Sequence, residues 1–247
     1  MNEGVSMSVR DMPLVDLACK CALPIVLSAI ETPDYPSLLG TCFAIQAHEN
    51  VLFVTAGHVV RDVSPETTRI SIPLGPGRDW PSAEIAKLVR PVANEGFESA
   101  LDLAIMVPTG VVAPSSGDFV PCSIERVANM AAVPTTAMFV VAGYPGGHPA
   151  GKGVDYDQRG IHVTRFISIG TYVGKSDLRG CHRLKLSTVI AGGPAGLSGS
   201  PVFRALHNED GSWTPALAGL VITGNNEDLH FLDVAYLQTV LNNLGVS

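Results

Sequence analysis

Residues 196–201 read Gly-Leu-Ser-Gly-Ser-Pro, and they place Ser198 in a tight turn with the apolar pair Val202 and Phe203 directly behind it. Glycine on both sides lets the chain bend sharply and lets a substrate carbonyl approach the main chain, which a Cβ atom would obstruct. A serine hydroxyl is a weak nucleophile unless a base takes its proton and a third group orients that base. The turn therefore predicts a base and an acid elsewhere in the chain.

Two upstream segments carry such partners. Residues 55–60 read TAGHVV and follow the apolar run 51–54, so we expect His58 just past the end of a strand, on a turn of small residues. Residues 101–107 read LDLAIMV and place Asp102 among apolar side chains, where a carboxylate is costly unless it has a hydrogen-bonding partner. An imidazole N–H would supply that partner, and His58 is the expected donor.

The three segments TAGHVV, DLAI and GLSGSP resemble those of the trypsin-like serine peptidase family, over roughly residues 25 to 240. Their chain order, histidine then aspartate then serine, is also that of the chymotrypsin type. The resemblance implies His58 as general base, Asp102 as its orienting carboxylate and Ser198 as nucleophile. It also implies an oxyanion hole formed by the N–H groups of Gly196 and Ser198.

Two further segments bear on this resemblance. Residues 140–146 contain Gly-Tyr-Pro, which resembles a turn of bacterial members of the family. Digestive enzymes of the family have an aspartate just before the nucleophile, which pairs with a newly cut N-terminal amine, whereas this chain has Leu197. We therefore expect a site that is competent without N-terminal processing, or one that is controlled by loop ordering or by a partner protein.

The resemblance implies an all-β fold of two six-stranded β-barrels of trypsin-like type, with the cleft between them and a C-terminal helix. Composition agrees, because only 16% of the residues are charged and 25 glycines and 18 prolines separate short apolar runs. We expect one barrel in residues 22–112, with the histidine and the aspartate, and another in residues 113–247, with the serine. The seam is expected at 108–121, which is rich in glycine, proline and serine. The predicted strands are 22–30, 41–46, 51–54, 105–107, 137–142, 161–169, 184–190 and 217–222.

The end of the chain has the pattern of an amphipathic helix. Asp233 can cap its N-terminus, and Gly245 can end it. The apolar positions of one face are Val234, Leu237, Leu241 and Leu244.

The five cysteines do not follow a disulfide-framework spacing, and their odd number leaves at least one unpaired. Secreted relatives bridge the histidine turn to an upstream strand, but Val59 follows His58 here, so Cys42 lacks that partner. The N-terminus has no signal pattern, and no apolar run approaches the roughly 18 residues of a membrane span. We expect a reduced, cytoplasmic protein without membrane contact. Cys19 and Cys21 lack a second pair for zinc, so neither a metal nor another cofactor is predicted.

The formal net charge of −7 and the absence of a basic run argue against nucleic-acid binding. The expected partners are a polypeptide substrate and a regulatory or recruiting protein. His148, His162 and His182 are scattered, and we interpret them as surface or loop residues. Ser200, two positions beyond Ser198, is interpreted as packing beneath the loop.

Specificity depends on residues that are distant in the sequence. By resemblance the pocket floor is Gly192, six residues before the serine, next to Gly193, and the opposite wall is Ile222, Thr223 and Gly224. This pocket carries no charge, so we expect a small or apolar P1 side chain. Alternatively, the two glycines form only a structural turn.

Together these patterns predict a serine endopeptidase that works through an acyl-enzyme intermediate. A catalytically silent barrel pair used for recognition is the alternative, although it would not need all three site residues. An esterase of different fold would have its nucleophile before the acid and the histidine. His207 and His230 do follow Ser198, but the remaining chain is too short for the αβ units of that fold.

Overall fold

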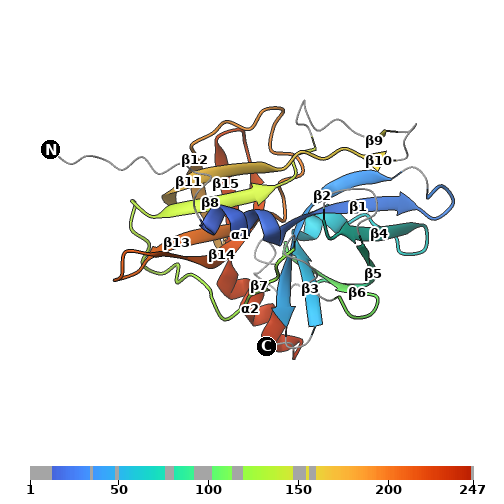
Figure 1. Cartoon of the computed structure of the whole chain (residues 1–247), viewed down its shortest axis with the longest axis horizontal. Helices are drawn as coiled ribbons and strands as arrows, with labels where there is room; N and C mark the ends of the chain where they lie inside the picture. Colours follow the sequence, from blue (N-terminus) through green and yellow to red (C-terminus); the bar gives the residue numbers. More distant parts are fainter. Residues whose placement is uncertain are drawn as a thin grey trace.

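The fold is all-β, with two closed six-stranded antiparallel β-barrels and a C-terminal helix (Figure 1). This architecture fits a chymotrypsin-like fold, as the sequence predicted. The computed structural model describes residues 13–33, 36–47, 50–75, 81–91, 102–112, 119–146, 154–155 and 160–245.

The first barrel closes through the pairing of β1 with β2, in the order β1-β4-β5-β6-β3-β2. The short strand β7 adds to β2 in parallel. The strands are β1 (Ala22–Ala29), β2 (Ser37–Ala47), β3 (Asn50–Thr55), β4 (Thr68–Pro73), β5 (Ser82–Val89), β6 (Ala104–Pro108) and β7 (Cys122–Ser123).

The second barrel runs in the order β11-β12-β15-β14-β13-β8 and closes through the pairing of β8 with β11. A separate two-stranded hairpin is formed by β9 (Val154–Asp155) and β10 (Gly160–Ile161). The barrel strands are β8 (Met138–Gly143), β11 (Phe166–Lys175), β12 (Cys181–Leu186), β13 (Pro201–His207), β14 (Trp213–Gly224) and β15 (Asp228–Asp233).

Buried strands were found from the sequence more easily than half-exposed ones. The core strands β1, β3, β6 and β8 lie close to their predicted positions. Of the barrel strands, the sequence missed β4, β5, β13 and β15. In β4, β5 and β15 apolar residues are interleaved with more exposed ones, and in β13 the run of consecutive buried residues is only three long. It also placed β11 too early and β12 too late along the chain. The predicted boundary between residues 112 and 113 stays a prediction, and the adjoining residues 113–118 lie outside the described part of the chain.

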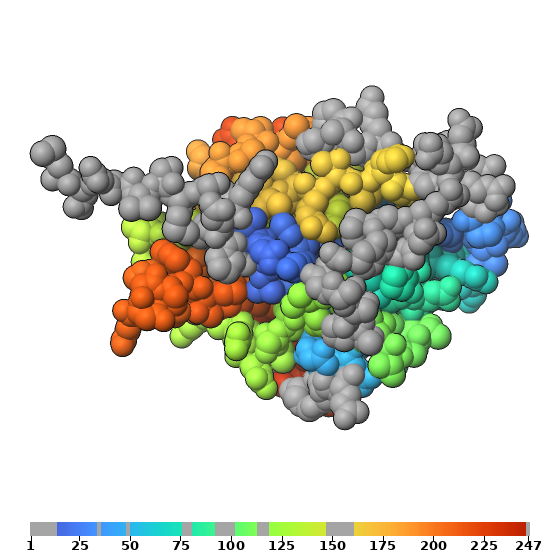
Figure 2. All heavy atoms as spheres, viewed as in Figure 1, coloured from blue at the N-terminus to red at the C-terminus, as the bar shows by residue number. Residues whose placement is uncertain are grey.

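A helix that the sequence analysis missed, α1 (Pro13–Cys21), precedes the first barrel but packs against β8, β13 and β14 of the second. Figure 2 shows its blue residues at the centre of one face, beside the orange β13–β14 hairpin. Its buried side chains, Leu14, Val15, Ala18 and Cys21, follow the three- and four-residue spacing of one helix face. The helix could have been predicted from this spacing of apolar residues in the sequence.

One apolar cluster runs through both barrels. Phe43 and Ile105 of the first barrel share it with Val140, Phe203 and Leu217 of the second, and all five are buried. Close-packed interiors transmit displacements and resist sliding. The cluster therefore holds the two barrels, and the residues on their facing loops, in one relative position.

The C-terminal helix α2 (Val234–Asn243) begins as predicted, with the Asp233 carboxylate accepting a hydrogen bond from the N–H of Ala235 at 2.9 Å. Gly245 has the left-handed φ of +68° expected of a residue that ends a helix. Val234, Leu237 and Leu241 of the predicted apolar face are buried, whereas Leu244 is 42% exposed. It follows the last helical turn, so its direction no longer follows the helical period.

The interpretation of His182 as a surface residue was also wrong. His182 lies in β12 and is buried, with Nδ1 at 2.8 Å from the Tyr172 hydroxyl and Nε2 at 3.1 Å from Asp233 Oδ2. Its position in an alternating strand turns it inward, and its two polar partners make that burial tolerable. His162 is exposed, whereas His148 lies outside the described residues.

None of the helices in the described part of the chain has the length and apolar character that crossing a bilayer requires.

Candidate active site

His58 lies in the short 3-10 helix η2 (Gly57–Val60), directly after β3. Asp102 immediately precedes the buried Leu103 at the start of β6, and β3 and β6 are paired. Both carboxylate oxygens of Asp102 bind His58: Oδ2 lies 2.6 Å from the ring Nδ1, and Oδ1 accepts from the backbone N–H at 2.7 Å. The ring is thus held in one orientation, with Nε2 directed away from Asp102. A Cβ atom on Gly57 would lie 3.1 Å from Asp102 Oδ1, so the small residue before the histidine permits this approach.

The environment of Asp102 favours its ionised form. Burial raises the pKa of its carboxyl, but the hydrogen bonds and charge of His58, with a smaller contribution from the Arg61 charge, outweigh burial and lower the pKa below its ordinary value. A carboxylate that stays ionised next to Nδ1 keeps the proton there and leaves Nε2 as an acceptor.

The turn that carries Ser198 joins β13 at its start and is held from several sides. Gly199 N–H donates to the Val221 carbonyl at 2.8 Å, and Ser200 N–H donates to the Leu197 carbonyl at 2.9 Å. Leu197 is fully buried in the core of the second barrel. Gly199 has φ +88°, and a Cβ atom there would come within 2.1 Å of the Thr41 carbonyl oxygen. This glycine is required both by the backbone conformation and by the contact with the first barrel.

Ser198 and His58 line the same cavity, which has a volume of about 510 Å³. The Ser198 hydroxyl donates to the carbonyl of Ile222 at 3.0 Å. Within the described part of the chain, Nε2 of His58 has no hydrogen-bond partner. The structure thus brings the predicted base and the predicted nucleophile to one cavity, with the serine proton directed at a main-chain carbonyl.

The N–H groups of Gly196 and Ser198 take no acceptor from any described residue. The Ala195 carbonyl accepts a hydrogen bond from Gly146 N–H at 2.8 Å. Carbonyl and N–H point in opposite directions across a trans peptide, so this bond turns the Gly196 N–H away from Gly146. The conformation requires glycine, because Gly196 has φ +91° and a Cβ atom would lie 2.6 Å from the Tyr144 carbonyl oxygen. Two neighbouring donors are therefore held free at the serine turn.

Thr41 is a site residue that sequence reasoning missed. Its buried hydroxyl donates to the Gly196 carbonyl at 2.7 Å and accepts from Tyr144 N–H at 2.8 Å. A side chain of β2 in the first barrel thus ties together two turns of the second barrel. A threonine in an apolar strand has no sequence signal for this role, because its partners lie 155 and 103 residues away.

Ser200 is fully buried, and its hydroxyl has no hydrogen-bond partner within the described residues. A Cβ atom on Gly143 would lie only 2.0 Å from that hydroxyl. Ser200 therefore packs under the turn against β8 and does not face the cavity of Ser198.

The second cavity, of about 270 Å³, also adjoins Ser198 and is lined by Pro194, Ala195, Val221, Thr223 and Gly224. Of the predicted pocket residues, Thr223 and Gly224 line it. Gly192, Gly193 and Ile222 are not among its lining residues; Ile222 is buried and offers its carbonyl to Ser198. Gly192 and Gly193 have φ of +83° and +93°, values that suit a tight turn before residue 194.

All five cysteines are free thiols. Burial, with the charges of Asp102 and Asp233, raises the pKa of the Cys181 thiol to about 11. Within the described ranges, no group of three or more histidine, cysteine, aspartate or glutamate side chains is placed to hold a metal ion.

Neither protein-family models nor curated protein sequences match this chain. The chemistry of the site must therefore be inferred from its own geometry.

Proposed function

We propose that this protein is a serine endopeptidase in which Ser198, His58 and Asp102 form a catalytic triad. The proposal depends above all on one observation: an oriented His58–Asp102 pair opens onto the same cavity as Ser198. The free N–H groups of Gly196 and Ser198 beside that serine support it. The two-barrel architecture is compatible with this chemistry.

In the proposed reaction, Ser198 Oγ attacks a peptide carbonyl while His58 Nε2 accepts the hydroxyl proton. Asp102 stabilises the imidazolium that forms, and the N–H groups of Gly196 and Ser198 donate to the oxyanion. The imidazolium then gives its proton to the leaving amine. Water, activated by the same histidine, hydrolyses the acyl-enzyme and restores the serine.

The smaller cavity is the proposed site for the side chain on the acyl side of the cleaved bond. Its lining of proline, alanine, valine, threonine and glycine carries no charge, and about 270 Å³ accommodates a small or medium side chain. We therefore propose an uncharged P1 preference.

A second candidate function is a catalytically silent recognition module, and one observation favours it. The Ser198 hydroxyl donates to Ile222, not to His58. In the peptidase proposal this is a resting rotamer, because catalytic hydrogen bonds of unliganded enzymes often tighten only when substrate binds. The peptidase proposal requires that rotation about the Ser198 Cα–Cβ bond exchanges the Ile222 carbonyl for the imidazole.

The five free thiols suit a reducing compartment, so we propose a cytoplasmic location.

A fluorophosphonate probe separates the two candidates, because it reacts covalently only with an activated serine. We expect the native protein to be labelled, Ser198→Ala to be unlabelled, and Ser200→Ala to keep its labelling, with peptide mapping placing the adduct on Ser198. Circular dichroism and thermal unfolding check that each variant is folded. An unlabelled native protein that is folded would refute the peptidase proposal and leave the recognition module.

A further inference from the structure

The cavity of about 510 Å³ lies on the histidine side of Ser198. In acyl transfer, the protonated histidine must reach the nitrogen of the leaving amine. The leaving part of a substrate must therefore lie next to His58. Both the 510 Å³ and the 270 Å³ cavity adjoin Ser198, but His58 lines the former and not the latter. This inference rests on the proposed function. If the protein is a serine peptidase, the larger cavity receives the residues that follow the cleaved bond.

The side chains that line this cavity are mostly apolar, and one of them is acidic. Leu27 and Leu39 come from β1 and β2, and Val59 and Val63 come from η2 and the turn after it. Together with the backbone near Ala195 they form a wall that can cover an apolar side chain. The wall is more extensive than that of the smaller cavity.

Asp62 is the only acidic residue among the described residues that line this cavity. It is exposed and forms no ion pair with any residue that the structure describes. Asp102 is already occupied by His58, so Asp62 is the carboxylate that remains for a ligand. An unpaired carboxylate beside an apolar wall favours a cationic group on a side chain that runs along that wall.

We propose that this enzyme also selects its substrates on the leaving-group side, for an apolar and a cationic side chain among the first two residues after the cleaved bond. Leu27, Leu39 and Val63 cover the apolar side chain, and Asp62 attracts the lysine or arginine. Asp62 is thus a specificity-determining residue and not a catalytic one.

Acyl transfer measures this preference independently of peptide cleavage. A small N-acetyl-dialanine p-nitrophenyl ester acylates Ser198 and releases nitrophenol. An added dipeptide amide then competes with water: its amine nitrogen attacks the acyl carbon, the bond to Ser198 Oγ breaks, and His58 passes the amine proton to that oxygen. Chromatography gives the ratio of aminolysis to hydrolysis for each amine.

We expect Leu-Arg-NH2 and Arg-Leu-NH2 to capture the acyl group on the order of tenfold better than Gly-Gly-NH2, because an apolar side chain is buried. Leu-Gln-NH2 should fall about two- to fivefold below Leu-Arg-NH2, as is usual for an exposed charge pair, and added salt should reduce that difference. Asp62→Asn should abolish the arginine preference and keep the leucine preference. Leu39→Asn should reduce the leucine preference.

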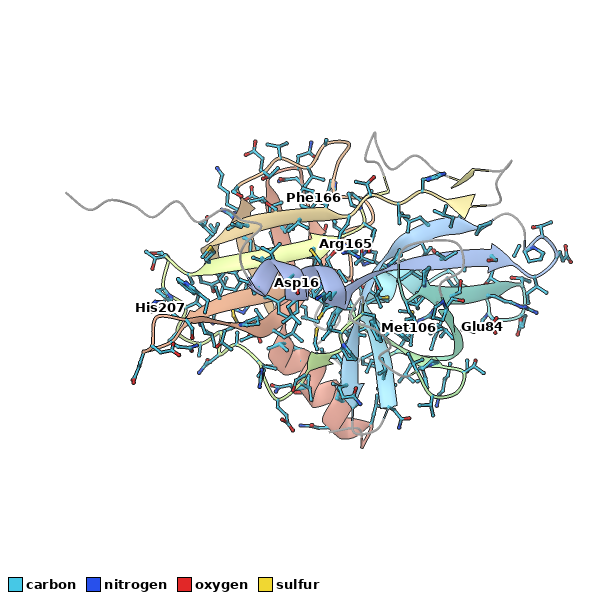
Figure 3. The ribbon with its side chains drawn as sticks, viewed as in Figure 1. Asp16, Glu84, Met106, Arg165, Phe166 and His207 are labelled. Carbon is cyan, nitrogen blue, oxygen red and sulfur yellow. The ribbon has the colours of Figure 1, made fainter. Side chains whose placement is uncertain are left out.

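The matched control is Glu209→Gln, which removes the same charge from an exposed position. Glu209 lies beyond His207, at the end of β13 opposite the serine turn, and His207 is labelled there in Figure 3. This variant should resemble the native protein with every amine. Two results would overturn this inference and leave the proposed function intact. One is normal ester turnover with equal capture of all amines, and the other is an arginine preference that survives in Asp62→Asn. Ester turnover that is absent, or unchanged in Ser198→Ala, would overturn the proposed function and the inference with it.

Discussion

Replacing Thr41 with valine tests whether a side chain of the first barrel holds the serine turn of the second. Valine has nearly the shape of threonine, so the change removes the hydroxyl with little change in volume. It breaks the bond to the Gly196 carbonyl and leaves the Tyr144 N–H without its acceptor at 2.8 Å. Thr41 is fully buried, so water does not replace the hydroxyl.

The free energy of unfolding should fall by about 2–4 kcal/mol, because one unsatisfied buried N–H costs ~1–3 kcal/mol and the lost second bond adds ~1 kcal/mol. For a chain of this size that lowers Tm by roughly 4–16 °C. The rate of fluorophosphonate labelling should also fall, by about tenfold or more, because the Gly196 turn is no longer held. The upper limit is the loss of rate, on the order of 10²–10³-fold, that follows removal of a complete oxyanion donor.

Thr171→Val is the matched control, since it removes a hydroxyl from an exposed position of β11 and should change unfolding by less than ~0.5 kcal/mol. Urea unfolding gives the free energies, and time-resolved labelling gives the rates. A Thr41→Val protein with native stability and a labelling rate within about twofold of native would refute the reasoning.

Three further outcomes are expected. The lowered pKa of Asp102 means that its contribution to stability is complete above the ordinary carboxyl pKa and is lost as the pH falls through the folded-state value. Urea unfolding between pH 2 and 7 should therefore show a weaker acid destabilisation in Asp102→Asn, and an equal acid slope in both proteins would contradict this. Burial raises the pKa of both Cys19 and Cys181, the latter to about 11, but Cys19 is only half-buried, so at pH 7.5 a thiol reagent should modify Cys19 faster than Cys181; mass mapping that finds the reverse order would contradict this. Leu241→Ala should lower the free energy of unfolding by about 2–5 kcal/mol and Leu244→Ala by less than ~0.5, so similar Tm values for the two variants would be inconsistent with the burial of α2.

Local sequence patterns predicted those structural features that depend on a short segment alone. An apolar run around Asp102 predicted a hydrogen-bonding partner, and the structure has His58 at 2.6 Å. The cap at Asp233 was predicted from the residues around it alone. Continuous apolar runs identified the central strands, because burial on both faces leaves few polar residues in them.

Sequence patterns did not predict burial or strand formation where these depend on residues that are distant in the sequence. His182 has the same local sequence whether it is exposed or buried, and only the positions of Tyr172 and Asp233 decide between the two. Leu244 fits the helical period but lies beyond the last packed turn. Strand β5 alternates weakly enough to pass for a loop until β4 and β6 pair with it.

The amino-acid order alone was sufficient to predict the class of fold and the three side chains of the proposed chemistry, because composition favoured an all-β chain and three short segments carry a family resemblance. The role of Thr41, the direction of the Ser198 hydroxyl and the cavity beside Asp62 became visible only in the folded chain. Each of these depends on atoms more than twenty residues apart, and strand pairing together with the packing of one barrel on the other, not local preference, brings such atoms together.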